Sequence, residues 1–148
     1  MDRTPSSERR GRTLPARAYL LFAVATLLGL AHHVDHVIRG NHVGWPITPE
    51  VTPFTYSLVI YPLVAVGLLL SVTGRAGARY WTVVMTLGTG MLVFFHVSPW
   101  AVEPPADVIL PYANPLFGYA AFVVLLLLIA VVAVGAGYSY RLWRGSTG

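Results

Sequence analysis

The residues best suited to chemistry are histidines and an acid at the end of the first apolar segment. The stretch 32–36 reads HHVDH, and His96 ends a separate apolar segment further along the chain. On a helix, His32, Asp35 and His36 are spaced i, i+3 and i+4 and therefore share one face. Two histidines four residues apart on a helix can bind the same metal ion. Asp35 is then either a third ligand or the acceptor that orients a ligand ring.

His96 is expected to reach the same depth as this cluster. The separation in sequence from Arg79 to His96 is similar to the separation from Arg17 to His36. Facing helices of a bundle can supply histidine and carboxylate ligands to one metal site. The predicted metal ligands are His32, Asp35, His36 and His96, with His33 and His42 as additional candidates.

The chain has no cysteine, which restricts the cofactors it can bind. Thiolate metal sites, disulfides and CxxCH haem attachment are excluded. A site of imidazole and carboxylate groups suits a transition metal such as Zn, Cu or Fe. Haem, with His36 and His96 as axial ligands, ranks lower because it does not need further ionisable groups clustered beside it. For a catalytic metal, Asp35, Glu103 and His42 are the candidate general bases.

The composition indicates a membrane protein rather than a soluble domain. Hydrophobic residues make up 55% of the chain and charged residues only 11%, whereas about a quarter of residues are charged in a soluble domain. All ten basic residues are arginines, and they flank apolar segments. Orientation in a membrane therefore explains the high isoelectric point better than nucleic-acid binding does. The predicted partner is the lipid bilayer, with no nucleic acid.

Four apolar segments, at about 18–38, 54–72, 80–97 and 116–138, are expected to be helices. Each is close to the roughly 20 residues that cross the hydrocarbon core. We therefore predict an all-α integral membrane protein whose four-transmembrane-helix bundle occupies residues 17–140. Pro62 is expected to kink the second span. Residues 1–16 are expected to be a disordered basic cytoplasmic tail, and residues 141–148 a second cytoplasmic tail.

The arginines predict the orientation of the bundle. All of them except Arg39 precede the first span, follow the fourth, or lie between the second and third. The positive-inside rule then makes both termini cytoplasmic in a multi-pass cell-membrane protein. Two Pro-rich outer loops, 40–53 and 98–115, and every histidine fall on the extracytoplasmic side.

The N-terminal region permits a second interpretation. A basic stretch, an apolar run and the sequence GLA at 29–31 resemble a secretory signal with cleavage after Ala31. Cleavage would leave His32 as an N-terminal copper chelator. We favour a retained helix, because the polar positions keep their helical spacing beyond Ala31 and because the basic region is long for a signal peptide.

Three functions are compatible with these features. The first is a small membrane metalloprotein, catalytic or not, with an outward-facing His/Asp cluster. The second is a non-enzymatic membrane subunit or scaffold without a cofactor, in which the histidines are solvated and Asp35 only pairs with Arg39. The third is a haem or quinone electron-transfer unit. A chain this small could work as a homo-oligomer or as a subunit of a membrane complex.

The orientation can be tested with topology reporters. Fusions at Arg75 and Gly148 should report a cytoplasmic location, and a fusion near Glu103 should report an external one, because the arginines are retained on the cytoplasmic side. A cytoplasmic signal at Glu103 would contradict the placement of all histidines on one side.

Overall fold

The computed structural model describes residues 14–40 and 47–146, and this part of the chain is entirely helical apart from turns and loops. The six helices are α2 (Ala16–Arg39), α3 (Pro53–Ser57), α4 (Ile60–Val72), α5 (Ala78–His96), α6 (Pro105–Ile109) and α7 (Pro115–Ser146). Four segments are long and apolar enough to span a membrane: α2, α3 together with α4, α5, and α7. The expected number of apolar spans is therefore confirmed within the described residues.

The helix boundaries differ from the expected spans in two places. The second span is divided into α3 and α4 at residues 58–59, just before Pro62. Proline has no N–H and its ring crowds the carbonyl four residues earlier, so the chain turns there. The last helix continues to Ser146, through most of the segment expected to be a tail. Its end is supported by Arg79, whose guanidinium lies 5.6 Å from the ring centre of Trp143.

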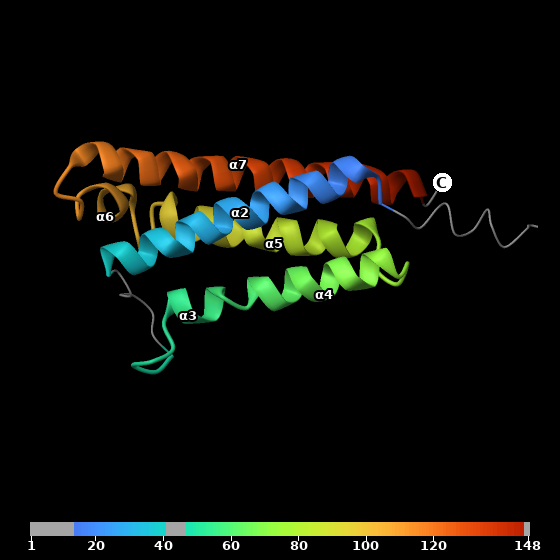
Figure 1. Ribbon diagram of the computed structural model, residues 1–148, viewed down its shortest axis with the longest axis horizontal. Coiled ribbons are helices and arrows are strands. Elements are labelled where there is room, and N and C mark those ends of the chain that lie inside the picture. Colours follow the sequence, from blue (N-terminus) through green and yellow to red (C-terminus); the bar gives the residue numbers. More distant parts are fainter. Residues whose placement is uncertain (1–13, 41–46, 147–148) are drawn as a thin grey trace, which may run out of the picture.

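The long helices lie side by side, with α2 and α5 running in one direction and α4 and α7 in the other (Figure 1). The short helix α6, which was expected to be loop, lies near the start of α7. Proline at its first position and Asp107 in its first turn both favour a helix start. The helix α2 ends at Gly40, whose positive φ of 65° suits a glycine C-cap.

A buried aromatic pair holds the bundle together at the end opposite the histidines. Phe22 and Trp81 stack with ring centres 3.8 Å apart, and both side chains are fully buried. The indole Nε1 of Trp81 donates to Ser71 Oγ at 2.9 Å, which joins α4 to α5. This contact satisfies the indole N–H, a polar group that would be costly to bury alone.

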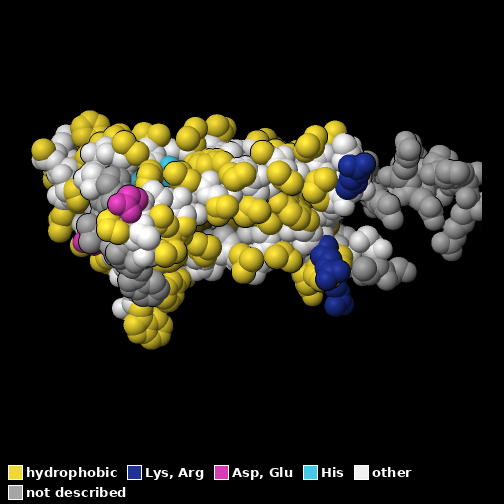
Figure 2. Space-filling model, turned by 90° about the horizontal axis from the view of Figure 1, so that it is seen from below, with side chains coloured by type: hydrophobic (Ala, Val, Ile, Leu, Met, Phe, Trp, Pro, Cys, Tyr) yellow, Lys and Arg dark blue, Asp and Glu magenta, His cyan; other side chains and the backbone are white. Residues whose placement is uncertain are grey.

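The outer surface is apolar along its length and charged at its ends. Leu20, Leu27, Leu69 and Leu127 are all at least half exposed. Figure 2 shows hydrophobic side chains between one end that carries arginines and an opposite end that carries acidic side chains and histidine. Large apolar side chains exposed along a whole bundle are unusual for a soluble monomer and suit contact with lipid.

The contact between α6 and α7 depends on a glycine. Gly118 is buried, and a side chain on its Cα would overlap the backbone carbonyl of Ile109 at the end of α6. Only glycine lets the two backbones approach this closely.

We therefore expect Gly118→Ala to lower the free energy of unfolding by about 1–3 kcal/mol, the usual cost of overpacking. Thermal unfolding in detergent measures the effect. Gly137→Ala is the matched control on the same helix, because nothing lies within 4 Å of its added carbon. Equal stability of the two variants would contradict the close contact between α6 and α7.

Candidate metal centre

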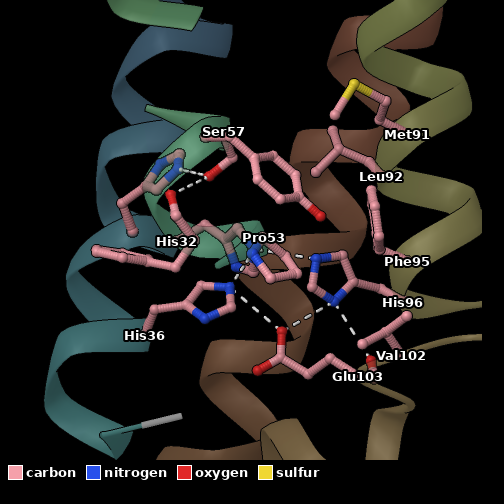
Figure 3. Close-up of a pocket in the computed structure, with 13 residues that line it drawn as sticks. His32, His36, Pro53, Ser57, Met91, Leu92, Phe95, His96, Val102 and Glu103 are labelled. Atoms are coloured by element: carbon pink, nitrogen blue, oxygen red, sulfur yellow. Dashed lines mark hydrogen bonds and ion pairs between the residues drawn. The ribbon is translucent and has the colours of Figure 1, made fainter. Parts of the chain in front are cut away.

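Three histidine side chains converge at one end of the bundle (Figure 3). His32 and His36 come from consecutive turns of α2, and His96 is the last residue of α5. The Nε2 atom of His32 lies 3.3 Å from Nε2 of His96 and 3.2 Å from Nε2 of His36. His32 and His96 are buried, and His36 is partly buried. Helical spacing and matched depth thus bring together the three histidines that the sequence favoured.

Glu103 completes the group from the loop between α5 and α6. Its backbone N–H donates to Phe95 O at 3.0 Å, which ties this loop to the last turn of α5. Its Oε2 atom lies 3.2 Å from His36 Nε2 and 3.2 Å from His96 Nδ1. Each of the four residues, His32, His36, His96 and Glu103, offers one ligand atom, and these atoms all lie within 4.8 Å of one another.

The nitrogen spacing matches that of ligands around a single ion. Bonds of about 2.0–2.1 Å to a tetrahedral metal place neighbouring ligand atoms about 3.3 Å apart. The two Nε2–Nε2 distances, 3.2 and 3.3 Å, have this value. The distance between His36 Nε2 and Glu103 Oε2, 3.2 Å, has it as well.

Hydrogen bonds alone satisfy this arrangement poorly. The Nε2 atom of a neutral imidazole is either one donor or one acceptor, yet His32 Nε2 faces two other Nε2 atoms. The Nδ1 atom of His32 is buried and has no hydrogen-bond partner among the described residues. A cation accepts lone pairs from all three Nε2 atoms at once, so it fits the convergence better than any tautomer does.

A buried arginine fixes the carboxylates around the histidines. The side chain of Arg39 is 0% exposed, and its Nε donates to Asp35 Oδ2 at 2.8 Å. Its Nη1 donates to Glu103 Oε1 at 2.7 Å and to the backbone carbonyl of Asp107 at 2.9 Å. The hydroxyl of Tyr112 donates to Asp35 Oδ1. Because Arg39 holds one oxygen of Glu103, the other oxygen is the one that lies among the histidines.

Two groups in the loops have displaced pKa values. Burial alone would raise the pKa of Glu103, but His96, His36 and Arg39 lower it by more, so the pKa of this carboxyl lies below its ordinary value. Glu103 is therefore ionised at neutral pH. Burial, followed by the hydrogen bond to Asp35, raises the pKa of Tyr112 to about 12. Tyr112 accordingly remains protonated at neutral pH and can donate to Asp35.

Not every predicted ligand lies in this group. The carboxylate of Asp35 is engaged by Arg39 and Tyr112, as an intrahelical Asp35–Arg39 pair would suggest, and it is not among the four converging residues. The Nε2 atom of His33 lies 2.9 Å from Ser57 Oγ, and its Nδ1 lies 2.8 Å from the carbonyl of Gly29. His42 lies outside the described residues.

The sequence indicated Glu103 only as a candidate base, not as a member of the cluster. Its position depends on the path of the outer loop and on the bond to Arg39, and no local spacing reveals either. The sequence offered one signal for Glu103: it is one of few acidic residues on the predicted outer side.

Comparison of the chain with models of protein families, with curated proteins and with solved structures found no match.

The hydrogen bond from Tyr112 can be tested by removing its hydroxyl. Tyr112→Phe should lower the free energy of unfolding by about 1 kcal/mol, because Asp35 then loses one of its donors. Tyr119→Phe, at an exposed position on α7, is the control. Chemical unfolding in detergent gives both values, and identical stability of the two variants would show that the Tyr112 bond contributes nothing.

Proposed function

We propose that this chain is a membrane metalloprotein that binds one transition-metal ion through His32, His36 and His96, with Glu103 as a fourth ligand or as the acceptor that orients His96. The spacing of the three Nε2 atoms carries the proposal. Asp35 supports the site through Arg39 rather than by touching the ion. The four apolar helices cross the cell membrane, both termini are cytoplasmic, and the ion lies near the extracytoplasmic surface.

The orientation is supported by the charges at the two ends of the bundle. Arg17, Arg75, Arg79 and Arg141 flank the helix ends opposite the histidines. Retention of arginine on the cytoplasmic side places the histidine group outside.

The donor set favours Zn, Cu or Fe, since it offers imidazole and carboxylate without sulfur. The pocket beside the histidines has a volume of about 90 Å³. Pockets that hold small molecules begin at about 300 Å³, so this one suits an ion with a water molecule and is too small for a porphyrin. This observation ranks haem below a single metal ion.

The role of Glu103 decides the type of site. Four protein ligands close a tetrahedral site, as in structural zinc centres, whereas three leave a position for water or substrate. With His96 Nε2 on the metal, its Nδ1–H donates to the backbone carbonyl of Glu103 at 3.3 Å, and Glu103 Oε2 lies 3.2 Å from the same nitrogen. A carboxylate in that position fixes the ring and raises its basicity as a ligand.

Metal analysis tests the proposal. Protein purified without a histidine tag and supplied with Zn²⁺ should bind about one ion per chain, and His36→Ala or His96→Ala should lose most of this binding, since each removes one of few nitrogens. Glu103→Gln should weaken the affinity by about 10–100-fold if the carboxylate only orients His96. Elemental analysis after dialysis gives the stoichiometry.

His33→Ala is the matched control, because His33 lies on the same helix but bonds to Ser57 instead of the group. It should retain stoichiometric zinc. Stoichiometric zinc in a His36→Ala/His96→Ala double variant would show that the site is elsewhere. Absence of zinc, copper and iron from the wild-type protein would favour the scaffold alternative.

A further inference from the structure

A second and larger cavity lies between α2, α4 and α5, with α7 closing its inner side. Its volume is about 270 Å³, close to the lower limit of about 300 Å³ for small-molecule pockets. Its walls are formed mainly by aliphatic side chains, among them Val64, Val84 and Leu92. A cavity with such walls favours a hydrocarbon group over a polar one.

The sequence leaves this space open because the facing helices carry small residues. Ala25 and Gly29 of α2 and Gly88 of α5 line the cavity. The helix α4 is joined to α5 by two bonds, from Trp81 to Ser71 at one end of α4 and from Tyr80 to the carbonyl of Leu63 nearer the other. Small residues opposite α4 therefore leave an internal volume rather than a close helix contact.

The cavity adjoins the histidine group. His32, His33, Ser57, Met91 and Leu92 line both the large cavity and the small pocket at the metal centre. Figure 3 shows Met91 and Leu92 on α5 above His96, on the side of the site away from Glu103. Polar side chains are thus concentrated at the end of the cavity that meets the candidate metal ligands.

The cavity also reaches the outer surface of α4. Val59 and Leu63 line it, yet they are 57% and 43% exposed. In the proposed orientation this surface faces lipid, so a molecule dissolved in the bilayer reaches the cavity without passing through water.

We propose that the cavity binds the single hydrocarbon chain of a membrane-dissolved amphiphile whose uncharged oxygen-containing head group lies beside His32. This deepens the proposed function and rests on it, since it names the class of molecule brought to the metal centre. His32 is only 4% exposed, and its Nδ1 has no partner among the described residues. The hydroxyl groups of Ser57 and Tyr61 lie at the same end; both are bonded to His33, and each oxygen keeps an acceptor lone pair for a neutral donor.

The nature of the lining restricts the ligand further. Among the described residues, the lining includes no arginine, aspartate or glutamate, so a charged head group would lose its hydration without gaining an opposite charge. The volume accommodates one chain and is too small for a two-chain phospholipid.

Photolabelling tests this inference. The full chain in phosphatidylcholine vesicles is irradiated with 1-dodecanol that carries a diazirine in mid-chain, and the labelled peptides are mapped by mass spectrometry. Label should attach to the wall segments around Val64 and Val84, and unlabelled 1-dodecanol should compete for it. Dodecyltrimethylammonium should compete at least about tenfold less effectively, equivalent to ~1.4 kcal/mol. Label spread evenly over lipid-facing residues without competition, or equal competition by the cation, would overturn the proposal.

Two pairs of variants locate the bound hydrocarbon chain. Val64→Trp fills the cavity and should abolish competable labelling, whereas Val66→Trp, at an exposed position of α4 outside the cavity, should not. Val84→Trp and Val83→Trp form the same comparison on α5. If Val64→Trp fails to fold, this second pair gives the result. Equal competable labelling of the two variants in a pair that folds would overturn the proposal.

Zinc content, measured on the same samples, separates this inference from the metal proposal. Competable labelling without zinc leaves the cavity assignment standing and contradicts the metal centre. Zinc binding without competable labelling contradicts the cavity assignment alone.

Discussion

A buried arginine at the end of α2 controls how the outer end of this protein is assembled. The side chain of Arg39 is 0% exposed, so its charge must be compensated inside the protein. Asp35, Glu103 and the carbonyl of Asp107 provide that compensation. Breaking such a buried pair by removing one partner typically costs about 3–5 kcal/mol, because the other charge is left without a counter-ion. This requirement joins α2 to the loop that carries Glu103, and the bond from Tyr112 to Asp35 adds a second connection.

The position of Glu103 follows from this requirement. Arg39 holds Oε1, and Oε2 consequently faces His36 and His96. The histidines take their own positions from helix geometry, two from α2 and one from the end of α5. The proposed metal centre thus combines a rigid helical part with a carboxylate that is placed by an ion pair. The cavity beside the metal centre is left open by small residues on α2 and α5. The metal centre and the cavity together form a site with a polar outer wall and an apolar inner wall.

The parts of this arrangement that the sequence predicted are those that depend on local spacing. The i, i+4 relation of His32 and His36 and the matched depth of His96 needed only a helical period and a span length. Glu103 was missed as a member of the group because its position depends on a long-range bond to Arg39. Asp35 shares the predicted helix face, but the donors that reach it come from Arg39 and from the distant Tyr112. Periodicity alone could not decide between these partners and a metal.

X-ray absorption spectroscopy of the untagged protein loaded with one equivalent of Zn²⁺ tests the central claim most directly. The account predicts a shell of four nitrogen or oxygen atoms at about 2.0–2.1 Å, with the outer-shell scattering of three imidazole rings. A zinc ion surrounded only by oxygen atoms, without imidazole scattering, would contradict it.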